Sequence, residues 1–147
     1  MPEEDVIERA HEDEREGLSP STQAGEFVRE EMEHIREGKH GARSPQQAIA
    51  IGLSKARRAG VKLPPPKRGK QRTKRQAKRD LAKGRRRRRK PSPKRSRAVR
   101  GALKRESRRS ASRKALSRQA KRAAKSRSAA NRSRAAKKAA KTRKRRR

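Results

Sequence analysis

The chain has 147 residues, and its 50 Lys and Arg against 15 Asp and Glu give a formal net charge of +35. Only 27% of the residues are hydrophobic and one Phe is the sole aromatic residue, so a single globular domain of this length is excluded, because the buried apolar surface would not offset the ordering entropy. There is no Cys, no apolar run of about 18 residues and no secretory signal, which excludes disulfides, thiolate metal sites and a membrane partner.

The charge divides the chain into an acidic part and a basic part. Residues 1–38 contain 13 of the 15 acids, whereas residues 61–147 contain 41 Lys and Arg and only two acids, Asp80 and Glu106. Most large apolar residues lie in the first 60 positions, so we expect the folded module to lie there.

We therefore predict a mostly α protein in three parts. Residues 1–63, the head, form a small helical hairpin or three-helix module. Residues 64–66 form a polyproline spacer, because consecutive prolines favour an extended conformation. Residues 67–147, the tail, are rich in Lys, Arg, Ala and Ser and form a long, largely disordered arm with transient helix.

Two helices are expected before residue 40. The first runs from Pro2 to about Glu16, with carboxylates in its first turn, where they favour the positive end of the helix dipole. The second begins between Ser19 and Gly25 and ends at Glu37. Its apolar stripe consists of Phe27, Val28, Met32 and Ile35, and Gly38 provides the stop.

A third helix is expected in the segment SPQQAIAIGLSKARRAG. Ser44 is a suitable N-cap, Pro45 stands at the first helical position, and Gln47 completes a Ser-x-x-Gln capping box. Gly60 ends the helix. Its predicted apolar face consists of Ile49, Leu53 and Ala56. Because the head has so few large apolar residues, we expect it to form a homodimer or to be stabilised by a bound partner.

The tail is predicted to bind nucleic acid. Alanine, Lys, Arg and Gln are strong helix formers, but we expect charge repulsion to keep the free tail open until phosphates neutralise it. Lys and Arg contact phosphates without reading bases, and they supply affinity by releasing counterions. Six consecutive basic residues, Arg85 to Lys90, are typical of a solvated arm that repels itself.

Two short motifs resemble groove-binding sequences; the first favours a groove contact, and the second, at residues 66–70, is interpreted as a contact with the phosphate backbone. Ser92-Pro93-Lys94-Arg95 resembles the turn motif of linker-histone tails, and residues 66–70 resemble an AT-hook that lacks its Arg-Gly-Arg-Pro core. The candidate contacts in the tail are Lys67, Arg68, Lys70, Arg85, Arg86, Arg87, Arg88, Arg89, Lys90, Lys94, Arg95, Arg143, Lys144, Arg145, Arg146 and Arg147, and those at the basic end of the third helix are Lys55, Arg57 and Arg58.

No pattern in the sequence indicates catalysis. The three histidines, His11, His34 and His40, lack a partner set at metal-ligand spacing, and the acidic pairs are typical of a solvated helix face. The Gly69-Lys70 pair lacks the first glycine of a P-loop. We therefore expect no enzyme activity, no catalytic residue, no cofactor, no metal and no small-molecule substrate.

Residues 19–63 resemble an uncharacterised family of small, mostly proteobacterial proteins, whose hallmark is a helix of the type QAIAIGLSKARR. The resemblance implies a bacterial source and a small helical module, and no mechanism. The tail separately looks like the Lys/Ala-rich, linker-histone-like arms of bacterial nucleoid proteins, although Arg is more frequent here than in those arms.

The leading hypothesis is a histone-like, nucleoid-associated, cytoplasmic protein that binds and compacts DNA without sequence preference. The first alternative is an RNA-binding or ribosome-associated basic protein, because nothing in the residues distinguishes ribose from deoxyribose. The second is a protein-interaction adaptor in which the tail is only a basic tether. DNA is favoured over RNA as the partner.

Overall fold

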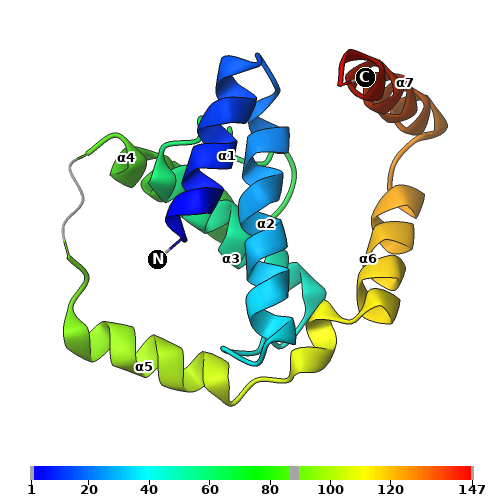
Figure 1. Cartoon of the computed structure of the whole chain (residues 1–147). Coiled ribbons are helices and arrows are strands. Elements are labelled where there is room, and N and C mark those ends of the chain that lie inside the picture. Colours follow the sequence, from blue (N-terminus) through cyan, green and yellow to red (C-terminus); the bar gives the residue numbers. More distant parts are fainter. Residues whose placement is uncertain (1, 87–89, 147) are drawn as a thin grey trace. The chain divides into compact units, whose positions relative to one another are not determined.

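The computed structural model describes residues 2–86 and 90–146, and the regular structure in this part of the chain is helical (Figure 1). The chain divides into two units, Met1–Ser112 and Arg113–Arg147. None of the helices in the described residues is long and apolar enough to span a membrane. The helices are α1 (Glu4–Arg15), α2 (Pro20–Arg36), α3 (Pro45–Ala59), α4 (Gln71–Gly84), α5 (Pro93–Lys104), the 3-10 helix η1 (Arg108–Ala111), α6 (Arg113–Lys125) and α7 (Ala129–Arg145).

The prediction of a long, largely disordered tail is wrong, because α4, α5, η1, α6 and α7 cover most of its described residues. Repulsion between the basic side chains of the tail is too weak to prevent helix formation, because a pair of like charges one helical turn apart costs only about 0.2–0.5 kcal/mol. Alanine, Lys, Arg and Gln have high helix propensity, and serine side chains cap two of the helices. Ser107 Oγ accepts from the Arg109 amide at 3.1 Å, and Ser128 Oγ accepts from the Asn131 amide at 3.3 Å.

The three helices of the head lie close to their predicted positions. The Ser44 side chain accepts a hydrogen bond from the Gln47 amide at 3.2 Å, as expected for an N-cap. In a capping box the Gln47 side chain would accept a hydrogen bond from the backbone amide of Ser44. Here it accepts from the amide of the preceding residue, Arg43, at 2.7 Å. The predicted stops Gly38 and Gly60 have φ values of +81° and +112°, a conformation that favours glycine.

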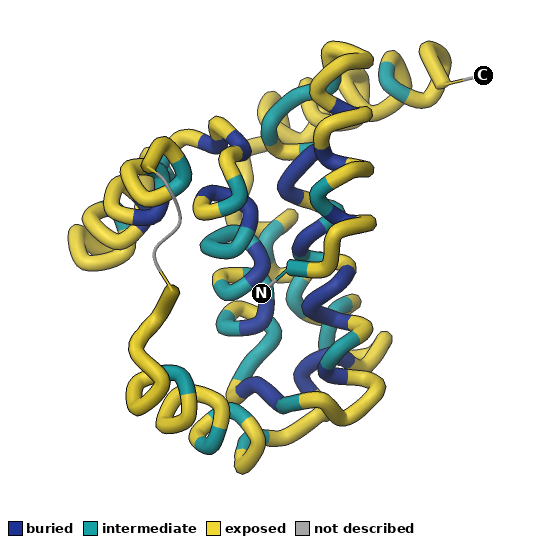
Figure 2. Tube along the Cα trace, turned by 60° about the vertical axis from the view of Figure 1, so that its left-hand side comes forward, coloured by how far each residue is buried: buried dark blue, intermediate teal, exposed yellow. Residues whose placement is uncertain are grey.

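The core of the first unit lies where α1, α2 and α3 pack together. Phe27 is fully buried at its centre, and Figure 2 shows the buried residues along the inward sides of these helices. The main cluster consists of Val6, Ala10, Ala24, Phe27, Ala56, Val61 and Leu63. Alanine makes up much of this core, so the helices pack closely rather than around many large side chains.

The buried face of α3 differs from the predicted one. Ala48, Gly52 and Ala56, spaced four residues apart, are buried, whereas Ile49 and Leu53 are only half-buried. A Cβ at Gly52 would lie 2.8 Å from the Cα of Val28 on α2, so only glycine permits this approach of the two helices. Of the predicted face, Ala56 is buried in the core and Leu53 packs against it. The prediction missed Ala48 and Gly52 because it favoured the larger side chains.

The first unit continues beyond the expected boundary at residues 64–66, since α4 packs against α3. Ala77 and Asp80 are the buried residues of α4. Gly84, the last residue of α4, lies so close to α3 that a Cβ there would overlap with the carbonyl oxygen of Arg57. A helix of the tail therefore completes the fold of the head.

A second segment of the tail is docked at the far end of α2. The Gly41 amide donates to the Leu103 carbonyl at 2.8 Å, and the Ala42 amide donates to the Ser107 carbonyl at 3.0 Å. Arg36 Nε donates to the Ala111 carbonyl at 3.0 Å. These hydrogen bonds, two between backbone groups and one from the Arg36 side chain, hold η1 against α2 and α3.

The proline segment is attached to α3 by a buried arginine. Arg57 Nε donates to the Leu63 carbonyl at 3.1 Å, and its Nη2 donates to the Pro64 carbonyl at 3.2 Å. Burial lowers the pKa of Arg57, and the nearby carboxylate of Asp80 opposes this shift. The side chain thus satisfies two carbonyls of a segment whose prolines have no amide hydrogen of their own.

Candidate functional site

The most basic surface belongs to the second unit. Residues 113–147 contain 17 Lys and Arg and no Asp or Glu, and neither α6 nor α7 has a buried residue. In Figure 2, α7, the helix that ends at the mark C, is almost entirely exposed, and the residues of α6 are exposed or half-buried. Because residues 113–147 contain no Asp or Glu, no acidic side chain of this segment attracts its Lys and Arg side chains, and the exposed ones are available to contact phosphates.

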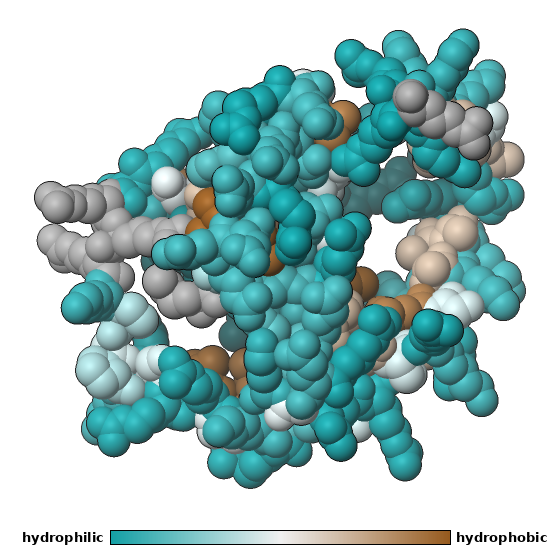
Figure 3. Space-filling model, viewed as in Figure 1, coloured by the Kyte–Doolittle hydropathy of each residue, from teal (hydrophilic) through white to brown (hydrophobic). Residues whose placement is uncertain are grey.

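Helix α4 adds a second basic surface, in the first unit. The helix is docked through Ala77 and Asp80, and most of the exposed residues on its other sides are polar or basic. The exposed basic residues of α4 are Arg72, Arg75, Lys78, Arg79 and Lys83. On the face shown in Figure 3, hydrophilic residues predominate and hydrophobic residues form only small patches.

Most of the candidate contacts predicted in the tail are exposed. Those before and after α4 are Lys67, Arg68, Lys70, Arg85, Arg86 and Lys90, those in the first turn of α5 are Lys94 and Arg95, and those at the end of α7 are Arg143, Lys144, Arg145 and Arg146. Ser92 is the N-cap residue of α5 and Pro93 its first residue, so the linker-histone-like motif begins a helix here. Arg87, Arg88, Arg89 and Arg147 lie outside the described residues.

The three residues at the basic end of α3 contact the protein itself. Lys55 Nζ lies 2.6 Å from Glu31 Oε2, and Arg58 Nε donates to Asp80 Oδ1 at 2.9 Å. Arg57 donates to backbone carbonyls, as described above. The structure therefore gives these three side chains roles in packing, and we leave them out of the candidate nucleic-acid interface.

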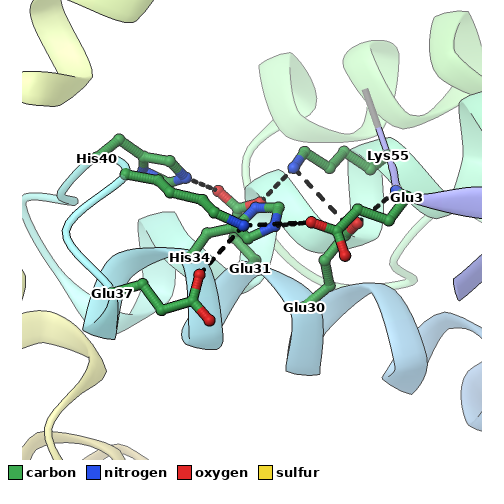
Figure 4. Close-up of polar contacts among 8 residues, drawn as sticks. Glu3, Glu30, Glu31, His34, Glu37, His40 and Lys55 are labelled. Atoms are coloured by element: carbon green, nitrogen blue, oxygen red, sulfur yellow. Dashed lines mark hydrogen bonds and ion pairs between the residues drawn. The ribbon is translucent and has the colours of Figure 1, made fainter. Parts of the chain in front are cut away.

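A polar cluster between α2, α3 and the loop after α2 is the second candidate site (Figure 4). Its centre is the pair Glu30 and Glu31, which are only 3% and 1% exposed. His34 and His40 lie beside them with ring centroids 6.3 Å apart and a T-shaped arrangement. The sequence shows no further metal ligand at a suitable spacing from these histidines, yet the structure brings His34 and His40 together with buried carboxylates.

The local geometry explains how the cluster forms. Glu31 and His34 are three residues apart on α2 and so lie on one side of the helix. The turn at Gly38 returns the chain, and His40 Nε2 then lies 2.9 Å from Glu31 Oε1. The Glu-x-x-His spacing was the signal available in the sequence, but the position of His40 depends on the loop.

At the surface, Glu3 closes the cluster. Its carboxylate lies 3.1 Å from His34 Nε2 and 3.2 Å from Lys39 Nζ, and hydrogen bonds from these two groups lower the pKa of Glu3. Lys39 also lies 3.1 Å from Glu37, and its hydrogen bonds to Glu37 and Glu3 raise the pKa of Lys39. Two sets of three donors in this region have ligand atoms within 4.8 Å of one another, namely Glu31, His34 and His40, and Glu3, Glu30 and His34.

Residues 20–68 match the model of a family of unknown function (DUF6496). The matched segment includes α2, α3 and the proline segment, and it contains the Glu31, His34, His40 and Lys55 side chains of the cluster. It ends before α4. No curated protein and no solved structure matches the chain.

Proposed function

We propose that this protein is a histone-like, nucleoid-associated protein of the cytoplasm, which binds the phosphate backbone of DNA without sequence preference and compacts the DNA. The observation that carries this proposal is the second unit, with 17 basic residues, no acid and two helices without a buried residue. Apart from Leu116, the apolar residues of these two helices are alanines, so the helices offer a protein partner little apolar surface, and a polyanion is the partner that fits their charge.

The shape of these helices supports binding to duplex DNA. Helix α7 has 17 residues, which at about 1.5 Å per residue corresponds to about 25 Å, and a single helix fits the major groove. Single-stranded nucleic acid is commonly held by stacking on aromatic side chains. The one aromatic residue, Phe27, is fully buried, so no aromatic side chain is available for stacking.

The exposed side of α4 supports the compaction part of the proposal. It provides a basic surface in the first unit, in addition to that of α6 and α7 in the second. A chain with basic surfaces on two units can contact two DNA segments and bring them together. Compaction then requires no contact with base edges, because phosphate contacts alone supply the affinity.

The test is a binding series with the full chain against duplex DNA, duplex RNA and single-stranded DNA at increasing salt concentration. We expect the tightest binding to duplex DNA, little sequence preference and a steep loss of affinity with salt. A preference for duplex RNA would favour the ribosome-associated alternative. Absence of salt-dependent binding to any of the three would reject the proposal and leave the adaptor alternative.

A matched pair of variants locates the interface. Replacing Lys137, Lys138, Lys141 and Lys144 of α7 by Gln removes four charges, and replacing the same residues by Arg retains them. The Gln variant should reduce the slope of log K against log salt by about 0.9 for each phosphate that these side chains neutralise in the unmodified chain, whereas the Arg variant should keep the slope. Equal slopes for the Gln variant and the unmodified chain would exclude α7 from the interface.

A further inference from the structure

We propose that Glu31, His34 and His40 form a binding site for a divalent transition-metal ion, and that Zn²⁺ is the ion their donor set fits. This site is independent of the proposed nucleic-acid binding. Two imidazoles and one carboxylate are a common three-ligand set for zinc, with metal–ligand distances of about 2.0–2.2 Å. The three donor atoms already lie within 4.8 Å of one another, so small side-chain movements would close them around an ion.

The orientation of His40 supports the proposal. Its Nδ1 lies 3.0 Å from the carbonyl oxygen of Gly41, a contact in which the ring nitrogen donates. With Nδ1 turned to the Gly41 carbonyl, Nε2 on the other side of the ring faces Glu31 Oε1, 2.9 Å away. Metal-binding histidines usually donate their second ring nitrogen to a carbonyl or carboxylate in this way. A cation between Nε2 and Oε1 would satisfy both.

The backbone that orients His40 is itself held in place. Gly41 is buried, and its amide donates to the Leu103 carbonyl at 2.8 Å. A Cβ at Gly41 would overlap with the carbonyl oxygen of Glu106, so the loop lies tightly against the tail segment. The Gly41 carbonyl that orients His40 is therefore held in place by the tail segment, as the partner of a metal ligand should be.

The charges of the cluster supply the second, independent argument. Glu31 is 1% exposed, and its carboxylate oxygens make ion-pair contacts with His40 and Lys55 but accept no well-aligned hydrogen bond from the described residues. Among the described residues, the ammonium group beside the buried pair is that of Lys55, 2.6 Å from Glu31 Oε2 and 3.9 Å from Glu30 Oε2. Two buried carboxylates thus share one Lys, and a divalent cation would neutralise the charge that remains.

The second donor set fits a metal less well. Glu3 is largely exposed and its carboxylate already contacts His34 and Lys39, and Glu30 Oε1 accepts from the Glu3 amide at 2.6 Å. Glu3 thus lies at the surface and is shared with Lys39, which belongs to neither donor set, whereas Glu31 is 1% exposed and its Oε1 faces His40 Nε2, a member of its own set. We therefore assign the ion to Glu31, His34 and His40, with Lys55 as a group that competes with the ion for Glu31.

The first experiment titrates Zn²⁺ into the metal-free full chain in the presence of a competing colorimetric chelator, with Mg²⁺ as the control ion. We expect one Zn²⁺ per chain and no comparable Mg²⁺ binding. His34→Gln and His40→Gln should each weaken Zn²⁺ binding at least about tenfold. The matched control is His11→Gln, because His11 is exposed on α1 and lies outside the cluster; it should retain the affinity.

Two further measurements distinguish loss of the metal site from loss of the fold. Circular dichroism checks that each variant is helical, and Zn²⁺ should raise the melting temperature of the unmodified chain and of His11→Gln but not of His40→Gln. Lys55→Met should bind Zn²⁺ more tightly, since it removes the competing ammonium. The proposal is overturned if the chain binds no Zn²⁺, or if His34→Gln and His40→Gln bind it as well as His11→Gln does. Unchanged or weaker binding by Lys55→Met would reject the competing role of Lys55.

Discussion

The carboxylate of Asp80 accepts a hydrogen bond from the guanidinium of Arg58 at 2.9 Å, and this bond joins the tail to the head. Asp80 is fully buried and also accepts from Ser54 Oγ at 2.8 Å and from Gln76 Nε2 at 3.1 Å. It is one of two acids among residues 61–147. One of the rare carboxylates of the basic part of the chain therefore attaches α4 to α3.

Replacing Asp80 by Ala should lower the free energy of unfolding by about 2 kcal/mol, because three donors lose their acceptor at a buried position. Urea unfolding of the full chain measures this change. The matched control is Lys78→Ala on the exposed side of α4, which should stay within about 0.5 kcal/mol of the unmodified chain. Equal effects of the two variants would mean that α4 does not depend on Asp80.

Replacing Gly84 by Ala should destabilise the first unit by about 1–3 kcal/mol, since the new Cβ would overlap with the carbonyl oxygen of Arg57. Gly25 provides the opposite case. It lies within α2 with no atom near the position of a Cβ, so Gly25→Ala should stabilise by about 0.5–1 kcal/mol. Thermal unfolding of both variants should shift in opposite directions; a neutral Gly84→Ala would contradict the close packing of α4.

Replacing Ser128 by Ala should reduce the helix content of the full chain, because the Ser128 side chain caps α7 through the Asn131 amide, and such caps contribute about 1 kcal/mol. Far-UV circular dichroism at several temperatures measures the loss. Ser133→Ala, within α7, should instead increase helix content, since Ala has the higher propensity. If neither substitution changes the spectrum, the helix content of α7 does not depend on the Ser128 cap or on the helix propensity of residue 133.

Replacing Arg57 by Ala should release the proline segment from α3, because the Leu63 and Pro64 carbonyls lose their donor. We expect a loss of about 2 kcal/mol and faster hydrogen exchange at the Val61 and Leu63 amides. Arg43→Ala, at an exposed position before α3, is the control and should leave exchange unchanged. Unaltered protection in Arg57→Ala would show that the segment is held by other contacts.

The predictions for the head were accurate where they depended on local signals. Ser44, Pro45, Gly38 and Gly60 fix helix ends by their own backbone and side-chain chemistry, so the bounds of α2 and α3 follow from them. The face of α3 was not predictable in the same way. Helix α3 carries larger apolar residues, Ile49 and Leu53, beside a stripe of small residues, Ala48, Gly52 and Ala56. Which of them is buried depends on how closely α2 approaches α3.

The docking of α4 on the head and the polar cluster were missed for a different reason. The charges of the tail are visible in the composition, but the buried contacts of Asp80 with Arg58 and Ser54 are not, because these partners lie 22 and 26 residues earlier in the chain. His34 and His40 are six residues apart across a helix end, and their distance depends on the loop at Gly38. Such contacts between distant residues have no local signature.

The sequence by itself determined the separation of acidic and basic residues, the capped helices of the head and the excess of cations. These properties belong to single residues or to neighbours within a helical turn, and the excess of cations makes a polyanion the expected partner. Only the tertiary structure decided which cations remain exposed. Packing places Lys55, Arg57 and Arg58 against carboxylates and carbonyls of the chain, leaves α6 and α7 without buried residues, and gathers two histidines around a buried glutamate.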